Sequence, residues 1–253
     1  MATLNALVAV YRELGRRMNG PAERRDCSME NKVWYLRANR LFAHATEASV
    51  EDCQHLFRMT LYPKRALVFE PDDRSRTVYL VKRGQIRIGR LTPDGKEVTV
   101  AMLGAGDLFG EETLFGETPR TTVAVCMEET LLCAARAEDM FGLLSRDPQL
   151  ALNVAQILSE RLGDASAAME DLAYARVPDR IVNLFARLAD EHGVPDPRGA
   201  RVELRLTHAD IASLIGSTRE TVSLEIAALV RAGRLIHEDR VFVVPSSELR
   251  TVG

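Results

Sequence analysis

The spacing of apolar positions changes from strand-like to helix-like along the chain. Within residues 61–136, short runs alternate apolar and polar side chains, as in 77–84, 85–91 and 96–103. Turn signals rich in Gly, Pro and Asp separate these runs. Closely spaced strands with such turns predict an all-β barrel or jelly roll.

Helical spacing dominates the segments on either side of the predicted barrel. Residues 31–57 are expected to form a small helical entry, with Trp34, Leu36, Leu41 and Phe42 as its apolar anchors. On the other side, Asp147-Pro148 marks the start of a long helix that runs to about Tyr174.

The long helix carries apolar residues whose spacing alternates between four and three positions. They are Leu158, Leu162, Ala165, Met169 and Leu172. This is the spacing of a coiled-coil seam, which most simply pairs with a second copy of the same helix. The alternative is a monomer whose helix lies on its own barrel.

A mixed pattern follows the long helix. Residues 177–179, Val-Pro-Asp, are predicted to break the helix and act as a hinge. An amphipathic helix is expected over 180–192, stopped by Gly193 and a turn at 195–197. A strand over 202–206 and a β-hairpin wing over 235–244 complete the C-terminal pattern.

Residues 206–231 predict a helix-turn-helix. Thr207 and Asp210 have the spacing of a capping box, and Gly216 suits the positive φ of a tight turn. Thr218 can then cap a second helix whose apolar stripe is predicted to be buried. That stripe contains Val222, Ile226, Leu229 and Val230.

The opposite face of the second helix carries the candidate DNA-binding residues. These are Thr218, Arg219, Glu220, Ser223 and Leu224. The recognition helix of such a motif enters the major groove, where Arg suits the two acceptors of guanine and Glu suits the amino group of cytosine. The alternative is an ordinary helical hairpin with a solvated Arg and Glu.

Composition does not by itself indicate a nucleic-acid ligand. The 253-residue chain has a formal net charge of −3, 46% hydrophobic residues and 27% charged residues. Residues 201–253 contain seven Arg and seven acidic residues. Attraction to DNA must therefore come from the local placement of cations.

The four cysteines, Cys27, Cys53, Cys126 and Cys133, follow neither a metal-ligand spacing nor a disulfide framework. Buried, inert thiols and no bound metal are expected. The N-terminus has no signal-peptide pattern and the chain no membrane-spanning run, so the cytoplasm is the predicted compartment, without membrane contact.

Residues 1–29 are expected to form a mobile arm carrying Arg16, Arg17, Arg24 and Arg25. The alternative role for this arm is contact with DNA phosphates or a polymerase. After the arm, the predicted domains are a barrel with helical entry over 30–146, a dimerisation helix over 147–176 and a winged helix-turn-helix over 177–253.

The string Ser-Thr-Arg-Glu-Thr-Val at 217–222 resembles the recognition-helix signature of the Crp/Fnr superfamily of bacterial transcription regulators. The order of barrel, long helix, hinge and winged helix-turn-helix is also similar over residues 34–245. The resemblance implies an α+β chain with a cyclic-nucleotide-binding-like jelly roll. It further implies a homodimeric regulator that places two recognition helices about 34 Å apart on near-palindromic double-stranded DNA and contacts RNA polymerase.

Residues 106–122 resemble the phosphate-binding cassette of cyclic-nucleotide-binding domains. Its Gly-Glu pair is Gly110-Glu111, and its later pair is Arg120-Thr121. Glu111 can accept from a ribose hydroxyl, while Arg120 can bind a phosphodiester and Thr121 can complete an anion nest. The alternative is an Arg–Glu surface pair in a loop between strands.

Three departures from the family pattern bear on ligand and target. The Thr-Ser pair that reads adenine in relatives aligns with Ala165-Ser166, so only the Ser166 hydroxyl remains. Cys27 and Cys53 do not supply the closely spaced N-terminal cysteines of iron-sulfur members. Many cyclic-AMP-dependent relatives have a second Arg where this chain has Leu224, which can pack against a thymine methyl instead.

The leading hypothesis is a DNA-binding regulator, activator or repressor, controlled by a cyclic nucleotide, with cyclic AMP as the first candidate. One alternative is a regulator of the same type without an effector, and another is a cyclic-nucleotide-binding subunit that acts on a protein partner. Catalysis is not expected, because no nucleophile with its base, metal-ligand set or P-loop is found.

Overall fold

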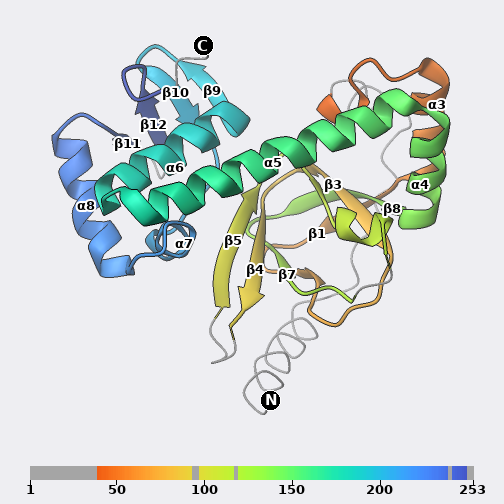
Figure 1. Ribbon diagram of the computed structural model, residues 1–253, viewed down its shortest axis with the longest axis horizontal. Coiled ribbons are helices and arrows are strands. Elements are labelled where there is room, and N and C mark those ends of the chain that lie inside the picture. The colour runs from red at the N-terminus through yellow and green to blue at the C-terminus, as the bar shows by residue number, and fades with distance from the viewer. Residues whose placement is uncertain (1–38, 93–96, 117–118, 239–240, 250–253) are drawn as a thin grey trace. The chain divides into compact units, whose positions relative to one another are not determined.

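The computed structural model describes residues 39–92, 97–116, 119–238 and 241–249 (Figure 1). Contacts divide the chain into two compact units, Met1–Ser159 and Glu160–Gly253. The division falls inside helix α5 (Pro148–Tyr174), which begins in the first unit and ends in the second. The predicted arm and the anchors Trp34 and Leu36 lie outside the described residues.

The first unit contains two four-stranded antiparallel sheets. One has the order β1-β8-β3-β6 and the other the order β2-β7-β4-β5. Their strands are β1 (Arg58–Tyr62), β2 (Leu67–Phe69), β3 (Thr77–Arg83), β4 (Ile86–Leu91), β5 (Glu97–Leu103), β6 (Leu108–Phe109), β7 (Val123–Cys126) and β8 (Thr130–Arg136). The predicted jelly roll is confirmed.

Strand β3 is buried on both of its faces, which divides the unit into two apolar cores. Tyr79 and Val81 point between the two sheets, where they meet Phe69 and Phe109. The ring centroids of Tyr79 and Phe109 are 5.0 Å apart in a stacked arrangement. The interior of the barrel is therefore packed with aromatic side chains.

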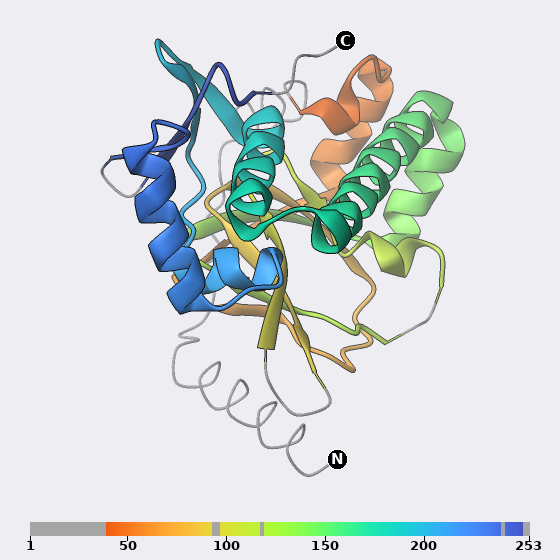
Figure 2. The same cartoon turned by 60° about the vertical axis from the view of Figure 1, so that its left-hand side comes forward.

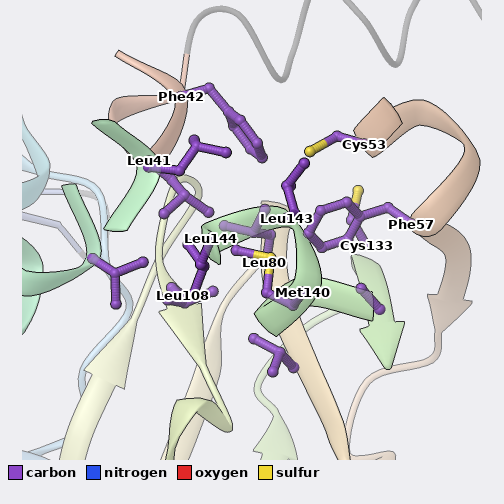
Figure 3. Packing of buried hydrophobic residues seen from close by; sticks show 14 of the residues in the cluster. Leu41, Phe42, Cys53, Phe57, Leu80, Leu108, Cys133, Met140, Leu143 and Leu144 are labelled. Carbon is purple, nitrogen blue, oxygen red and sulfur yellow. The ribbon is translucent and has the colours of Figure 1, made fainter. Parts of the chain in front are cut away.

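The other face of β3 supports a helical layer. Its helices are the 3-10 helix η1 (Arg40–Phe42), α3 (Glu47–Leu56), α4 (Ala137–Arg146) and the first half of α5. Val78 and Leu80 pack in this core with Leu143, and Leu80 and Leu143 are labelled in Figure 3. Helix α4 was not predicted, although its buried Met140 and Leu143 face this core as an amphipathic helix requires.

Three of the four cysteines are confirmed as buried free thiols: Cys53, Cys126 and Cys133. Cys53 and Cys133 belong to the core beneath the helices, as Figure 3 shows. Cys126 lies in the barrel interior, where burial raises the pKa of its thiol to about 12. Cys27 lies outside the described residues.

Asp147 holds the start of α5, as the Asp-Pro pair predicted. Its carboxylate accepts hydrogen bonds from the backbone N–H groups of Gln149 and Thr46. Hydrogen bonds from Ser49 first, and from these groups, lower the pKa of Asp147. One turn later, the Asn153 amide donates to the carbonyl oxygens of Leu41 and Ala43, which fixes α5 to η1.

The second unit packs three helices with a four-stranded antiparallel sheet of order β11-β12-β10-β9. The helices are α6 (Val177–His192), α7 (His208–Leu214) and α8 (Arg219–Arg231). The strands are β9 (Gly193–Asp196), β10 (Gly199–Val202), β11 (Ile236–Glu238) and β12 (Val241–Pro245). Helices α7 and α8 are joined by a short turn (Figure 2), and β11 with β12 forms the predicted wing.

Three local predictions in this unit were wrong. Helix α6 stops at Gly193 as predicted, but residues 193–196 form strand β9, so the turn predicted at 195–197 is misplaced. The segment pairs with β10 at the edge of the sheet, where Pro195 is tolerated. Strand β10 ends at Val202 and does not continue to Leu206. In addition, Pro178 lies in the first turn of α6, so the predicted hinge residues begin a helix, and the break is at Ala175-Arg176.

The C-terminal end of α5 is fastened to α6 by polar contacts. The Asp171 carboxylate accepts from Arg187 Nη1 at 2.8 Å and from Asn183 Nδ2 at 2.7 Å. Arg180 donates to the carbonyl oxygens of Leu172, Ala175 and Ile215. Arg180 therefore connects the last turn of α5 with the residue that ends α7.

We expect Asp171→Ala to lower the free energy of unfolding by about 2 kcal/mol or more, because it leaves the largely buried Arg187 cation without its carboxylate. Denaturant unfolding measures the change. Glu170→Ala removes the exposed neighbouring carboxylate on the same helix and should cost less than about 0.5 kcal/mol. Equal losses in the two variants would contradict this role of Asp171.

Candidate effector and DNA-binding sites

The cassette predicted at 106–122 begins with a left-handed glycine. Gly110 has φ 75° and precedes the 3-10 helix η2 (Glu111–Leu114). A Cβ at Gly110 would lie 2.9 Å from the Thr77 carbonyl oxygen and 3.0 Å from Arg120 Nη1. A glycine is therefore required both by the backbone angle and by the close approach of Arg120.

The backbone of Arg120 is paired with the loop between β2 and β3. Its N–H donates to the Asp73 carbonyl oxygen at 3.0 Å, and its own carbonyl oxygen accepts from the Asp72 N–H at 2.8 Å. Asp72 has φ 67°, a left-handed conformation that Asp tolerates better than most residues. These two bonds fix where the Arg120 side chain starts.

The Arg120 guanidinium is completely buried in the first unit. Its side chain has 0% exposure, and Nη2 donates to the carbonyl oxygens of Thr77 at 2.6 Å and Ser75 at 3.3 Å. Nη1 donates to Glu112 Oε1 at 2.6 Å. The guanidinium carbon lies 3.9 Å from the centroid of the Phe69 ring, a cation–π distance.

The alternative of an Arg–Glu surface pair in this loop is wrong in one respect. Arg120 does pair with a glutamate, Glu112, but the arginine is buried instead of lying on the surface. Sequence reasoning missed Glu112, although it directly follows the Gly-Glu pair. The turn of η2 brings Glu112 to Arg120, a contact that only the fold reveals.

The remaining cassette residues lie in different surroundings. Glu111 is half-buried at the start of η2, and Thr121 is exposed directly after Arg120. Ser166 belongs to the second compact unit and is exposed on α5, where its hydroxyl donates to the Leu162 carbonyl oxygen at 2.9 Å. The structure thus brings Gly110 together with Arg120, while the Ser166 hydroxyl is bonded to its own helix.

The helix-turn-helix has the predicted local structure. Thr207 and Asp210 form a capping box, with the Asp210 carboxylate accepting from the Thr207 N–H at 3.0 Å. Gly216 has φ 60° in the turn. The Thr218 side chain accepts from the Thr221 N–H at 3.2 Å and caps α8.

Helix α8 presents a polar N-terminal end to solvent. Arg219 and Glu220 are exposed, and neither makes a side-chain hydrogen bond within the described ranges. Leu224, one turn later, is 73% exposed. Val222, Ile226 and Leu229 are buried as predicted, but Val230 is exposed and was wrongly included in the buried stripe.

Ser223 differs from the other candidate DNA-binding residues. It is half-buried, and its hydroxyl lies 2.7 Å from Nδ1 of His208 on α7. Burial first, and then the nearby His237 and Arg219, lower the pKa of His208. The contact joins the two helices of the motif, which sequence spacing did not predict.

Two family models match the chain, one over the barrel and one over the helix-turn-helix. A model of the cyclic nucleotide-binding domain matches residues 59–147, and a model of the Crp-like helix-turn-helix domain matches residues 179–251. The "Cyclic AMP receptor protein" of Thermus thermophilus is 32% identical over 198 residues, which cover 78% of this chain and 88% of that protein.

This chain belongs to the Crp/Fnr superfamily of DNA-binding transcription regulators.

Two further Crp/Fnr relatives support the assignment. The "CRP-like cAMP-activated global transcriptional regulator" of Mycobacterium tuberculosis is 30% identical, covering 74% of this chain and 84% of that protein. A solved structure of the c-di-GMP responsive regulator CLP of Xanthomonas campestris is 28% identical with a TM-score of 0.64, covering 79% of this chain and 99% of that one.

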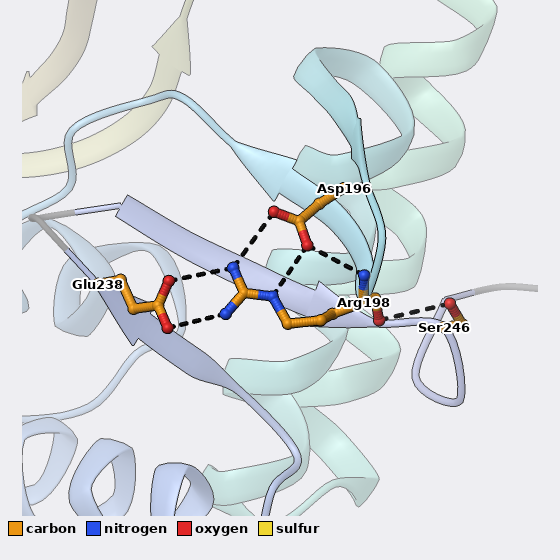
Figure 4. Close-up of polar contacts among 4 residues, drawn as sticks. All are labelled: Asp196, Arg198, Glu238 and Ser246. Atoms are coloured by element: carbon orange, nitrogen blue, oxygen red, sulfur yellow. Dashed lines mark hydrogen bonds and ion pairs between the residues drawn. The ribbon is translucent and has the colours of Figure 1, made fainter.

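One arginine of this Crp/Fnr regulator is already paired with the wing. Arg198, in the turn between β9 and β10, donates to Asp196 and to both carboxylate oxygens of Glu238 (Figure 4). The hydrogen bonds from Arg198 lower the pKa of Asp196 to about 2. The cluster holds one cation and two anions, so it adds no positive charge for DNA.

A second paired cation follows the recognition helix of the Crp/Fnr regulator. Arg234 donates to Glu248 at 2.9 Å and to Asp179 on α6 at 3.0 Å. Arg219 has no such carboxylate partner among the residues that the structure describes. Residues 201–253 contain equal numbers of Arg and acidic residues, but the charges are not all paired. Arg234 is neutralised by carboxylates, whereas Arg219 remains available to DNA.

The residues that the structure describes hold neither a metal-binding cluster nor a membrane-spanning helix. No group of three or more His, Cys, Asp or Glu side chains among them is arranged to hold a metal ion. No helix within the same ranges has the length and apolarity that crossing a membrane requires.

Proposed function

We propose that this Crp/Fnr regulator binds a near-palindromic DNA site as a homodimer, contacts RNA polymerase and is controlled by a cyclic nucleotide. The observation that carries the DNA half of the proposal is the exposed N-terminal end of α8. Its polar residues are free to reach base edges, while its buried stripe anchors the helix. Arg219 would read guanine and Glu220 cytosine, with Thr218 and Ser223 beside them.

Dimerisation is supported by an apolar face on α5. Leu162 and Met169 are 68% and 62% exposed, and Leu172 is 46% exposed. Large apolar side chains at heptad spacing are covered when two such helices pair. In contrast, Leu150, Val154 and Ile157 on the first half of α5 are buried in the core beneath the helices.

The effector half of the proposal rests on the cyclic nucleotide-binding domain. Cyclic AMP is the first candidate, because the names of the Thermus and Mycobacterium relatives refer to it. Arg120 would bind the phosphodiester together with Thr121 and the backbone beside Gly110, and Glu111 would accept a hydrogen bond from the ribose 2′-hydroxyl. The Xanthomonas regulator responds to c-di-GMP instead, so relatives of this type respond to different nucleotides.

A second candidate function is a regulator of the same type that works without an effector. One observation favours it: the Arg120 guanidinium already has an anionic partner and carbonyl acceptors within the barrel. In that case the barrel would serve as a scaffold for α5, and the amount of protein would set transcription.

The dimer proposal predicts that Leu162→Glu yields a monomer in sedimentation equilibrium, because two carboxylates would face each other in the seam. Leu152→Glu is the matched control. Leu152 is equally prominent, at 62% exposure, but does not lie at a heptad position of the seam. A dimeric Leu162→Glu protein would rule out this seam.

The DNA proposal predicts a half-site that keeps G·C contacts from Arg219 and Glu220 and differs from the family pattern at the position facing Leu224. Selection from random DNA should show a changed preference there for Leu224→Arg, since Leu cannot donate to guanine. Identical preferences for wild type and variant would disprove the role of Leu224.

Arg219→Ala and Arg231→Ala form a matched pair in the same DNA assay. Both arginines are exposed, but Arg231 lies at the opposite end of α8. We expect only Arg219→Ala to lose discrimination at the guanine, by about 1–3 kcal/mol.

The effector proposal predicts that saturating cyclic AMP raises specific DNA affinity about 5- to 150-fold at one fixed salt concentration. Fluorescence anisotropy with a labelled operator measures this change, and calorimetry with cyclic AMP and cyclic GMP measures direct binding. Unchanged DNA affinity together with no heat for either nucleotide would instead support the regulator without an effector.

A further inference from the structure

Some N–H donors of the buried Arg120 guanidinium have a hydrogen-bond acceptor, and another has none. Nη2 is bonded to the carbonyl oxygens of Thr77 and Ser75, and Nη1 is bonded to Glu112. Nε is buried and has no hydrogen-bond partner in the described structure. A buried N–H without an acceptor is costly and uncommon in native proteins, which indicates a place for an oxygen atom.

Two of the groups that accept hydrogen bonds from Arg120, the Thr77 carbonyl and the Glu112 carboxylate, differ in how easily they can move away from it. The Thr77 carbonyl belongs to strand β3, whose pairing with β8 begins at Thr77. Glu112 is held on the short helix η2, and 43% of its side chain is exposed. Its carboxylate can therefore turn into water, whereas the carbonyl of Thr77 stays in place.

The flat face of the guanidinium does not offer an alternative approach. The guanidinium carbon lies 3.9 Å from the centroid of the Phe69 ring, which covers one face, and 6.0 Å from the centroid of the Tyr79 ring. An anion reaching Arg120 without breaking the bonds to Thr77 and Ser75 can use only Nε and Nη1, and Glu112 already holds one of the two N–H groups of Nη1. An anion at the other Nη1 N–H would lie close to the Glu112 carboxylate, and because the two negative charges repel each other, the anion and Glu112 compete.

We propose that Glu112 is an internal competitor for Arg120 and that it sets the affinity of the barrel for a phosphodiester anion. This inference rests on the proposed control by a cyclic nucleotide, and it assigns a specificity-determining role to a residue outside the Gly-Glu and Arg-Thr pairs. When the ligand binds, Glu112 leaves Nη1 and the phosphodiester oxygen replaces it. In the free protein, Glu112 keeps the buried cation neutralised.

The test compares binding of cyclic AMP and of inorganic phosphate to wild type, Glu112→Gln and Glu112→Ala. Gln keeps an acceptor for Nη1 without the charge, so the fold is retained, while Ala serves as a second variant. Removing a charge-assisted competitor should tighten cyclic AMP binding about 10- to 100-fold by calorimetry. Phosphate should raise the melting temperature of Glu112→Gln more than that of wild type.

Two controls separate this competition from general effects of charge. Glu129→Gln neutralises a glutamate on the same unit that pairs with Arg83 in an exposed salt bridge, and it should leave both ligand affinities unchanged. Adding Arg120→Gln to Glu112→Gln should abolish the gain, because the ligand would lose the cation that Glu112 releases.

The outcomes distinguish this inference from the proposed function. If wild type and Glu112→Gln bind cyclic AMP equally, the competitor role is wrong while control by a cyclic nucleotide stands. If phosphate stabilises Glu112→Gln selectively but cyclic AMP binds neither protein, the competitor role holds and cyclic-AMP control fails. If neither ligand distinguishes the two proteins or binds either one, the competitor role is overturned.

Discussion

The burial of β3 on both faces is the constraint on which the first unit depends. Alternate side chains of the strand enter two different cores: Tyr79 and Val81 fill the barrel, while Val78 and Leu80 support the helices. The strand cannot shift its register by one residue without exchanging these two sets. The carbonyl oxygen of Thr77, at its first residue, is consequently a fixed acceptor for Arg120.

This fixed strand gives the cassette its chemistry. Arg120 is bound by backbone on both sides, and its charge is balanced by one carboxylate that comes from a short helix. Leu114, at the end of that helix, packs in the same core as Leu150 and Val154 of α5. A movement of η2 would therefore displace the N-terminal half of α5, because closely packed side chains transmit displacement.

The second unit achieves its order mainly through local hydrogen bonds. The capping box at Thr207 and the cap at Thr218 satisfy the first N–H groups of both helices. Arg180 and Arg234 use their donors on carbonyl and carboxylate groups of this unit, so neither is an unpaired cation. What is left for recognition is the N-terminal end of α8, where Arg219 and Glu220 have no competing partner in the described structure.

The sequence alone determined the features whose causes lie within a few residues. Alternation marked the barrel strands, Thr207 with Asp210 marked the start of α7, and Asp147-Pro148 marked the start of α5, because caps and turns bond to neighbours in the chain. The tertiary structure decided what depends on distant partners. Arg120 donates to Thr77, 43 residues away, and its contact with Glu112 follows from the orientation of η2. Likewise, β9 forms because β10 offers it an edge, and Ser223 turns toward His208 because α7 packs beside α8, which no local spacing specifies.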